Sequence, residues 1–389
     1  MNSTGKKNIL ICPLNWGIGH ATRVQVIAGE LRQRGHNIYI AAPRILHHTF
    51  DKSVYDELIN LWSASVYYSG YLPLYIAVIF QLPVLFASFL AGRLRLPGII
   101  RKYDIHLVIS DNCFGMWNRK TYSVYITHQL RVALPRVFAF ARPLVSAIHR
   151  SIASRYDECW VPDLPGDDNL SGMLSHECKR PPNTKYVGPL SRFYKHAIFS
   201  SSSEEEYPDR LKGVSGGGGV RNFITPPSPF TLALLSGPEP QRTILERIII
   251  SQKERMPGKL VIVAGTPGKN TQTDDDIIRY PWLDGADLEH LIRKADLIIC
   301  RSGYSTVMDL YYTGKSALLV PTPGQPEQEY LAVYLSDKYN VTTIVQKDLA
   351  EQAHLPSVNN DIKWPAKNQA LLDSVLDQLL RKLPGQARE

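Results

Sequence analysis

The sequence has few cysteines, and none of them is arranged to bind a metal or to build a disulfide framework. The five cysteines of the 389-residue chain, Cys12, Cys113, Cys159, Cys178 and Cys300, are scattered, and no two form a C-x-x-C pair. This usage is typical of a reduced protein without a structural zinc site. The first residues, MNSTGKKN, lack the apolar core and cleavage site of a secretory signal. We therefore expect a cytoplasmic protein with no metal.

Acidic residues are also in deficit, because the formal charge is +8. An excess of Lys and Arg favours a negatively charged partner, which could be nucleic acid, anionic lipid or a phosphate-bearing ligand. The basic residues are dispersed, and no basic strip interleaved with aromatic residues is present. We therefore expect no nucleic-acid partner.

The length predicts two domains, and the strand and helix patterns place one in each half of the chain. Ile9–Cys12, a helical stripe over 21–34 and a strand at 36–42 form a β-loop-α-β unit, and 105–111 and 123–129 look like further parallel strands. Four more strands, starting near Phe230, alternate with helical patterns. The predicted fold class is α/β, with two Rossmann-like domains in tandem: residues 1–195, a flexible linker at 196–228 with four consecutive glycines, and residues 229–389.

Residues 72–91, LPLYIAVIFQLPVLFASFLA, are the most hydrophobic segment of the chain. Gln81 and Pro83 interrupt it, and a basic cluster of Arg93, Arg95, Arg101 and Lys102 follows. We expect 72–102 to be a membrane-interface helix or to form an acceptor-lipid groove. A helix pair buried in the first domain and a true membrane span are the alternatives.

The loop NWGIGHATR follows the first strand, and it carries glycines and a histidine at the start of a helix. Gly17 and Gly19 allow the backbone to approach a ligand closely, and the free N–H groups of the helix suit a diphosphate. A dinucleotide-binding fingerprint needs a third glycine where this chain has Thr22. At a helix N-terminus His20 is pushed toward its neutral form, which makes it a candidate general base. A capping or core histidine is the alternative.

Polar residues also follow two later strands of the first half. Asp111 could orient the His20 ring, with Asn112 beside it, although a turn or helix cap explains both residues equally well. His128 and Gln129 are expected to bind substrate. In parallel sheets such strand ends share one crevice, so we predict a single cleft.

The second half contains two candidate diphosphate sites at strand ends. LLSGPEPQR places Ser236 and Gly237 after a strand and Arg242 in the next helix. The stretch ADLIICRSGYSTVMDLYYTGKSALLVPTPGQPEQEYLA is the strongest signal in the chain. It contains a tight turn at Arg301, Ser302 and Gly303, a helix with Asp309, and a Pro-Gly loop that ends in acidic and amide residues. A plain α/β unit is the alternative.

These motifs, GIGHATR at the front and CRSGYSTVMDL...VPTPGQPEQEYLA at the back, resemble bacterial glycosyltransferases of the GT-B fold. The most similar group contains the peptidoglycan N-acetylglucosaminyltransferase MurG and the diacylglycerol glucosyltransferases, with a family 28-like C-terminal domain. The resemblance implies an N-terminal acceptor domain, a C-terminal domain for a UDP-sugar donor, and an active site in the cleft between them. It also implies a cytoplasmic enzyme that is peripheral on the inner face of the membrane.

By this resemblance Gly17, Gly19 and His20 match the acceptor-side loop, and Asn112, His128 and Gln129 are assigned to the acceptor. The turn that holds the donor phosphates is matched by Ser302, Gly303, Ser305 and Thr306. Asp309 matches the ribose ligand, and Gln328 with Glu329 matches a glutamine pair near the donor sugar. Two residues of the pattern differ: Glu329 replaces the second glutamine, and NWGIGH replaces GGTGGH.

The implied reaction is an inverting, metal-independent transfer of an N-acetylhexosamine or hexose to an acceptor hydroxyl, which is lipid-linked or part of the cell envelope. His20, oriented by Asp111, would act as the base. A UDP-aminosugar hydrolase is the alternative, because its G-x-G-H-x-x-R loop is matched through Arg23 and its histidine activates water. A UDP-sugar epimerase or a non-catalytic nucleotide- or lipid-binding module is a weaker interpretation.

Overall fold

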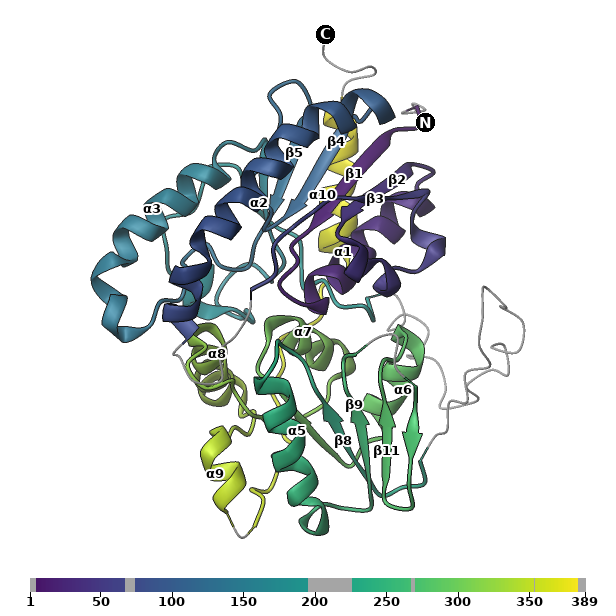
Figure 1. Ribbon diagram of the computed structural model, residues 1–389, viewed down its shortest axis with the longest axis vertical. Helices are drawn as coiled ribbons and strands as arrows, with labels where there is room; N and C mark the ends of the chain where they lie inside the picture. The colour runs from purple at the N-terminus through teal and green to yellow at the C-terminus, as the bar shows by residue number, and fades with distance from the viewer. Residues whose placement is uncertain (1–4, 67–73, 195–225, 267–269, 353, 384–389) are drawn as a thin grey trace.

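The computed structural model describes residues 5–66, 74–194, 226–266, 270–352 and 354–383, without the side chains of 74–78 and 136. Two parallel-sheet domains are stacked along the long axis, the N-terminal domain above the C-terminal one in Figure 1. The prediction of two Rossmann-like domains is therefore confirmed. Residues 196–225 of the predicted linker lie outside the described ranges.

The N-terminal sheet has seven parallel strands in the order β3-β2-β1-β4-β5-β6-β7. Its strands are β1 (Asn8–Pro13), β2 (Asn37–Ala42), β3 (Glu57–Asn60), β4 (Leu107–Asp111), β5 (Tyr122–Ile126), β6 (Glu158–Val161) and β7 (Thr184–Tyr186). Its helices are α1 (Ile18–Gln33), α2 (Leu74–Tyr103) and α3 (Arg142–Ala153), with short 3-10 turns η1 (Arg44–Thr49), η2 (Lys52–Val54), η3 (Arg136–Ala141) and η4 (Gly172–Leu174). The strand order reverses between β1 and β4, and ligands of parallel sheets bind at such a point.

The C-terminal sheet has the order β10-β11-β9-β8-β12-β13, and only the β10–β11 pair is antiparallel. Its strands are β8 (Phe230–Leu234), β9 (Lys259–Val263), β10 (Gln272–Thr273), β11 (Ile277–Tyr280), β12 (Leu297–Cys300) and β13 (Leu318–Leu319). The helices after β8 are α5 (Gln241–Ser251), α6 (Gly285–Lys294), α7 (Tyr304–Thr313), α8 (Pro326–Tyr339), α9 (Gln346–Glu351) and α10 (Ala370–Lys382), with a 3-10 turn η6 (Lys253–Arg255). Here the order reverses between β8 and β12, which places the predicted diphosphate loops side by side.

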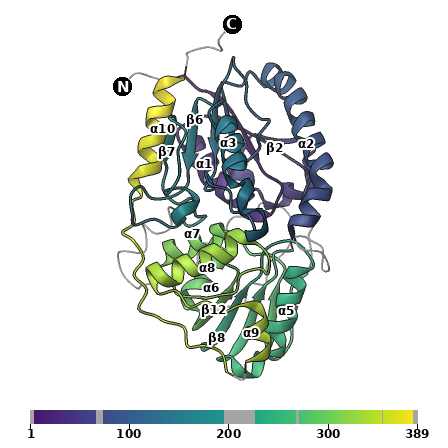
Figure 2. The same ribbon diagram turned by 90° about the vertical axis from the view of Figure 1, so that its left-hand side faces the viewer.

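The last helix, α10, returns to the N-terminal domain, where it lies beside β6 and β7 (Figure 2). Arg34 contacts Asp373 at 2.5 Å, and Lys382 contacts Glu158 at 2.8 Å. Residues 370–382, which the sequence assigned to the C-terminal domain, thus pack on the N-terminal one. The reason is that α10 is amphipathic, and its buried leucines cover the open side of that domain.

The two domains touch along a continuous seam. Tyr304 on α7 donates to the Pro162 carbonyl at 2.9 Å, and Ser191 donates to Asp309 at 2.7 Å. A Cβ atom on Gly19 would lie 2.5 Å from the Ser305 hydroxyl, so α1 and α7 approach each other at a glycine. The start of α1, which carries His20, therefore faces the C-terminal domain directly.

Candidate active site

The His20 ring and the Asp111 carboxylate lie together at the reversal point of the N-terminal sheet. β1 pairs with β4 so that Pro13 stands opposite Asp111, and α1 begins five residues after Pro13. Gly17, with φ of 143°, makes the turn into α1 in a region that favours glycine. His20 Nδ1 lies 2.9 Å from Asp111 Oδ2. The contact that the sequence predicted is present.

Arg23, one turn after His20, is buried and holds the same carboxylate. Its Nε donates to Asp111 Oδ2 at 2.7 Å, and its Nη2 donates to Oδ1. Burial alone would raise the pKa of Asp111, but Arg23 and His20 hold it at about 2. Asp111 is therefore ionised and accepts from His20 Nδ1–H. Arg23 Nη2 also lies 2.9 Å from His20 Nδ1, but it already donates to Asp111 Oδ1, so we assign the Nδ1–H tautomer to the His20 ring.

This tautomer leaves Nε2 of His20 as a lone-pair acceptor. The side chain is 18% exposed and lines the main cavity of the site. Burial lowers the pKa of His20 below 6.5, Asp111 acts in the opposite direction, and Arg23 adds to the lowering. The ring is consequently neutral at pH 7, as a general base must be.

A third polar group reaches the site from the other domain. Glu327, in the first turn of α8, accepts from His128 Nε2 at 2.7 Å and from Gln129 Nε2 at 2.5 Å. His128 also stacks on Tyr304, with ring centroids 4.4 Å apart. His128 and Gln129, two of the residues predicted to bind the acceptor, therefore lie at the seam and line the same cavity as His20.

A cavity of about 900 Å³ opens from this polar cluster between α2 and α3. Apolar side chains form most of its wall, including Leu82, Phe86, Val145 and Ile148. The polar lining residues include His20, Asn112, His128, Gln129 and Glu327. The site thus joins an ionisable cluster to a large, mostly apolar space.

Asn112 has a positive φ of 54° and belongs to a buried polar chain in the wall of this cavity. Tyr125 contacts Asn112 Oδ1 at 3.0 Å and His149 Nε2 at 3.0 Å. Burial lowers the pKa of His149 to about 4, although the Leu130 carbonyl acts against this. Asn112 is thereby held beside Asp111, in the position where the sequence predicted an acceptor contact.

Several predicted donor residues follow β8 and β12, at the reversal point of the C-terminal sheet, and none of the predicted donor residues lines the 900 Å³ cavity. Ser236 and Gly237 are exposed after β8. Arg242 pairs with Glu239 and donates to the Gly265 carbonyl at 3.1 Å. Gly303 caps α7, and Ser305 and Thr306 lie in the first turn of that helix.

Arg301 is fully buried beneath the predicted donor loops, and its hydrogen bonds hold several backbone segments together. Its guanidinium donates to the carbonyls of Val320 (3.1 Å), Pro321 (3.2 Å) and Gln241 (2.8 Å), and to the side chain of Gln346 (2.7 Å). Burial lowers the pKa of Arg301 to about 10. These acceptors surround the guanidinium that the sequence predicted to contact a donor.

The predicted donor residues Asp309, Ser302 and Gln328 form hydrogen bonds with protein groups in the structure. Asp309 bonds Ser191 and pairs with Arg192 at 3.1 Å. Ser302 donates to the Gln328 carbonyl at 2.8 Å, and the Gln328 side chain accepts from the Thr322 amide at 2.9 Å.

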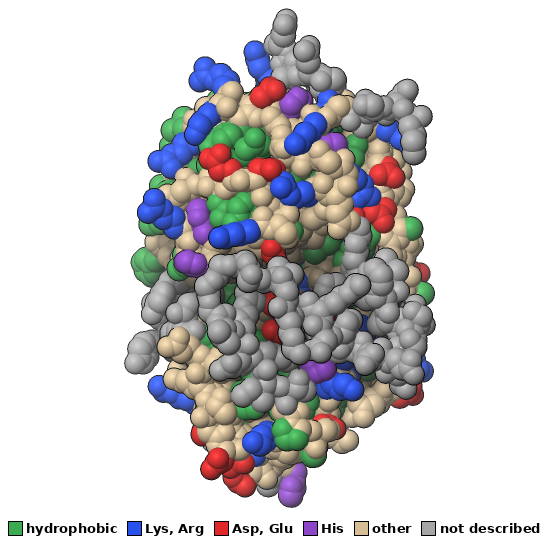
Figure 3. Space-filling model, turned by 90° about the vertical axis from the view of Figure 1, so that its right-hand side faces the viewer, with side chains coloured by type: hydrophobic (Ala, Val, Ile, Leu, Met, Phe, Trp, Pro, Cys, Tyr) green, Lys and Arg blue, Asp and Glu red, His purple; other side chains and the backbone are tan. Residues whose placement is uncertain are grey.

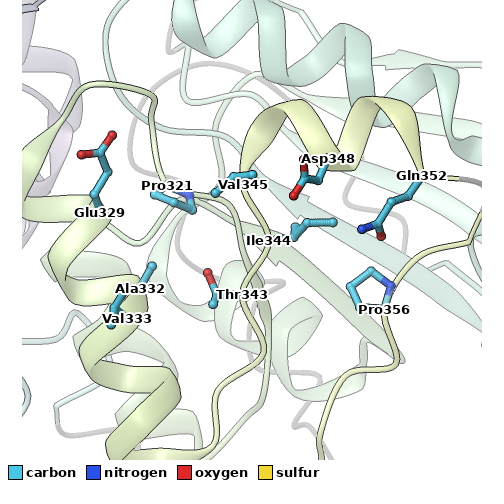
Figure 4. A pocket seen from close by; sticks show the side chains of 10 residues that line it. All are labelled: Pro321, Glu329, Ala332, Val333, Thr343, Ile344, Val345, Asp348, Gln352 and Pro356. Atoms are coloured by element: carbon cyan, nitrogen blue, oxygen red, sulfur yellow. The ribbon is translucent and has the colours of Figure 1, made fainter.

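Glu329 accepts from the Gly324 amide at 2.8 Å and borders a separate cavity of about 480 Å³ between α8 and α9 (Figure 4). It does not line the cavity that contains His20.

The sequence placed Glu327 at the end of the Pro-Gly loop but gave it no role, and it gave none to Arg192 or the amphipathic helix α3. Arg23 was used only for the hydrolase motif. Helical spacing places Arg23 on the same face as His20, which is a signal that could have identified it. Within the described residues, no group of three or more His, Cys, Asp or Glu side chains is placed to hold a metal ion.

Residues 246–370 match the family described as Glycosyltransferase family 28 C-terminal domain. The chain is 27% identical over 174 residues to the UDP-N-acetylglucosamine--N-acetylmuramyl-(pentapeptide) pyrophosphoryl-undecaprenol N-acetylglucosamine transferase of Sulfurihydrogenibium sp. (strain YO3AOP1), over 42% of this chain and 50% of that protein. It is 24% identical over 285 residues to the protein of the same name from Rickettsia canadensis (strain McKiel), over 61% of this chain and 77% of that protein. The chain therefore spans about half the length of the first relative.

Among solved structures, the chain is similar to CalG4, the calicheamicin glycosyltransferase. The TM-score is 0.57 and the identity 12%, over 89% of this chain and 86% of that chain. At this identity the similarity shows the fold alone. Together the matches confirm the predicted resemblance and the predicted fold.

Proposed function

We propose that this chain, whose C-terminal domain is a glycosyltransferase family 28 domain and whose two domains have the GT-B fold, is a glycosyltransferase. Its donor is a UDP-sugar, carrying an N-acetylhexosamine or a hexose, and its acceptor is a hydroxyl group on a lipid-linked molecule of the cell envelope. The names of the relatives support both the donor and the acceptor class.

The observation that carries the proposal is a neutral, carboxylate-oriented histidine in the wall of a large apolar cavity. A soluble sugar acceptor would not need such a space, whereas a hydrocarbon chain bound between α2 and α3 could present a hydroxyl group to His20 Nε2. Apolar burial contributes roughly 25 cal/mol per Å² to such binding.

In the proposed reaction His20 Nε2 takes the proton of the acceptor hydroxyl. The acceptor oxygen forms its bond to the anomeric carbon from the face opposite the leaving group, while the bond from that carbon to the UDP diphosphate oxygen breaks. Asp111 stabilises the resulting imidazolium through Nδ1. Base assistance of this kind supplies about 10²- to 10⁴-fold in rate.

The C-terminal domain is the proposed site of the departing UDP. The backbone amides at the start of α7, near Ser305 and Thr306, and the exposed loop at Ser236 and Gly237 suit a diphosphate. The expected independence from metal is tested by adding EDTA, which should leave turnover unchanged.

Peripheral membrane binding is part of the proposal and is supported by exposed apolar side chains on two neighbouring elements. On α2, Phe80 is 75% and Leu94 70% exposed; on η3 and α3, Phe140 is 82% and Leu144 65% exposed. Both α2 and α3, which belong to the N-terminal domain in Figures 1 and 2, contribute lining residues to the cavity. A bilayer that contacts both helices would therefore deliver a lipid next to the cavity.

Residues Ile79–Tyr103 could cross a membrane by length and composition alone, with a mean hydropathy of 1.4. One side of this helix, however, packs on the N-terminal domain: Leu96 is fully buried and Arg93 lies over the Trp117 ring. These contacts favour a helix lying in the membrane interface.

On the face shown in Figure 3, basic and acidic side chains are interspersed over the N-terminal domain.

The test of the proposed function is a product screen with UDP-sugars and two lipid acceptors, diacylglycerol and a polyprenyl-diphosphate sugar, in anionic vesicles. We expect a glycolipid with inverted anomeric configuration, detected by mass spectrometry and NMR. Absence of a product with every UDP-sugar, although UDP binds, would exclude these acceptors.

Vesicle flotation tests the membrane contact. Serine at both Phe140 and Leu144 should reduce binding to anionic vesicles at least about tenfold, since each side chain contributes roughly 1.5–3 kcal/mol when buried. The control is Val333→Ser, because Val333 is 58% exposed on α8 of the other domain. Equal binding by the wild type, the double variant and the control would contradict the proposed surface.

The UDP-aminosugar hydrolase is retained as a second candidate because of Arg23. Its bonds to Asp111 give the whole G-x-G-H-x-x-R loop a single ordered arrangement, and His20 in that arrangement could equally deprotonate water. Stoichiometric UDP release without an acceptor, at the rate seen with one, would favour the hydrolase.

A further inference from the structure

Glu327 is a carboxylate of the C-terminal domain that is largely buried against the N-terminal one. Its side chain is 16% exposed, and its two oxygens accept from His128 and Gln129. Although burial would raise the pKa of Glu327, the neighbouring His128 and the Gln325 amide lower it below its ordinary range. The carboxylate is therefore ionised in the closed seam.

The proton positions on His128 follow from its two neighbours. Arg23 Nη1 lies 3.2 Å from His128 Nδ1. A guanidinium can only donate hydrogen bonds, so Nδ1 must accept and the ring proton must be on Nε2. That proton is donated to Glu327 at 2.7 Å, while stacking on Tyr304 fixes the ring plane.

The same Arg23 side chain holds Asp111 with its Nε and Nη2 atoms, and Asp111 in turn accepts from His20 Nδ1. A directed chain of hydrogen bonds therefore connects the two domains: His20 to Asp111, Arg23 to Asp111, Arg23 to His128, and His128 to Glu327. Only the last of these bonds crosses the seam.

We propose that Glu327 is a positioning residue that couples contact between the domains to the orientation of the His20 base. With the domains in contact, Glu327 holds the His128 ring where Nδ1 accepts from Arg23 Nη1, so the Nε2–H tautomer and the Nη1 arm are fixed together. Arg23 in turn fixes Asp111 against His20. The inference rests on the proposed function, in which His20 is the base. In this account the base is fully oriented only when the C-terminal domain, with its donor, is in place.

The effect to be measured is on turnover and not on donor binding. Misplacing a catalytic group by about 1 Å through a remote change can cost on the order of 10²-fold. We expect Glu327→Ala to lower kcat about 10²-fold, with the Kd for UDP unchanged. The matched control is Asp337→Asn, an exposed carboxylate change on the same helix.

Two conservative variants separate the hydrogen bond from the charge. Glu327→Gln keeps an acceptor oxygen at the same reach, whereas Glu327→Asp keeps the charge and draws the carboxylate back by about one methylene, roughly 1.5 Å. The chain of hydrogen bonds from Glu327 through His128 and Arg23 to Asp111 and His20, called the relay below, predicts that Glu327→Gln retains more kcat than Glu327→Asp. The opposite order would overturn the proposal, because it would show that the charge alone matters.

Histidine NMR needs no substrate, so it tests the hydrogen-bond relay even if no transfer activity is found. Two-bond ¹⁵N–¹H spectra of histidine-labelled protein report each ring's tautomer, and the His20 and His128 signals are assigned with His20→Gln and His128→Gln. We expect Nδ1–H for His20 and Nε2–H for His128 in the wild type and in Glu327→Gln, and a mixed His128 tautomer in Glu327→Ala and Glu327→Asp. Unchanged spectra or an unchanged kcat in Glu327→Ala would overturn the proposal. An inactive wild type with these spectral changes would reject the proposed function and support the relay.

Discussion

Replacing Asp111 by asparagine should destabilise the N-terminal domain strongly, because the carboxylate is the only acid paired with Arg23 among the described residues. The Asp111 side chain is 0% exposed and Arg23 is 2% exposed, so neither can turn to solvent. Breaking a buried ion pair by removing one partner costs about 3–5 kcal/mol.

The titration of Asp111 also indicates how much the ion pair with Arg23 stabilises the fold. The pKa of Asp111 is about 2 in the fold against an ordinary 3.8. Because the pKa of Asp111 is depressed in the fold, its ionisation adds about 2 kcal/mol to the free energy of unfolding above pH 3.8. This contribution is lost as the pH falls from 3.8 to about 2. The first estimate is the larger because asparagine also leaves the Arg23 charge without a counterion.

Thermal unfolding followed by scanning fluorimetry is the assay. At about 2–4 °C per kcal/mol for a domain of this size, Asp111→Asn should lower Tm by roughly 6–20 °C. A double variant, Arg23→Met with Asp111→Leu, removes both charges and should regain most of the loss while staying inactive. A Tm within about 2 °C of wild type for Asp111→Asn would refute this account of the pair.

Three further predictions concern titration and the seam. Since the pKa of His149 is about 4 in the fold, the unfolded state binds more protons between pH 4 and 6.5, and stability should fall by about 3 kcal/mol as the pH drops through that window. His149→Phe should flatten this dependence in urea unfolding at several pH values. Because the pKa of His20 is lowered, the acidic limb of kcat/KM should lie below pH 6.5, and a limb above 7 would contradict a neutral base. Gly19→Ala places a Cβ 2.5 Å from the Ser305 hydroxyl and should lower kcat by up to about 10²-fold. Ser305→Gly should restore part of that loss, and no rescue would argue against contact between the two helices.

Much of the fold and one half of the site could be predicted from the sequence, because both depend on local patterns. His20 and Asp111 follow buried strands, and parallel strands place their carboxyl ends at one edge. The helical start after Gly17 was visible for the same reason.

The remaining site residues depend on how distant segments meet. Glu327 is separated from His128 by 199 positions, so its role follows only from the docking of the two domains. Asp309 has the helical spacing of a ligand, but α7 turns that face toward Ser191 and Arg192. Arg301 looked like an anion ligand at a strand end, yet the carbonyls of Val320 and Pro321 enclose it. Such choices are made by tertiary packing, which no local pattern encodes.

For the α2 segment, too, the sequence predicted the local feature but not how it packs with a distant segment. Its composition indicated an apolar interface helix, and the exposed Phe80, Phe86 and Leu94 agree with a surface position. The second wall, α3, was missed because its apolar residues alternate with arginine and histidine along the sequence. Only the cavity between the two helices shows that they act on one site.

The central claim is that His20 activates the hydroxyl of an acceptor. The most direct measurement compares wild type, His20→Ala and the exposed control His48→Ala for UDP formation from a UDP-sugar, with and without lipid acceptor, alongside UDP binding by calorimetry. We expect acceptor-dependent turnover in wild type and His48→Ala, a loss of about 10²- to 10⁴-fold in His20→Ala, and the same UDP affinity in all three. Unchanged turnover in His20→Ala, or UDP release in wild type that ignores the acceptor, would contradict it.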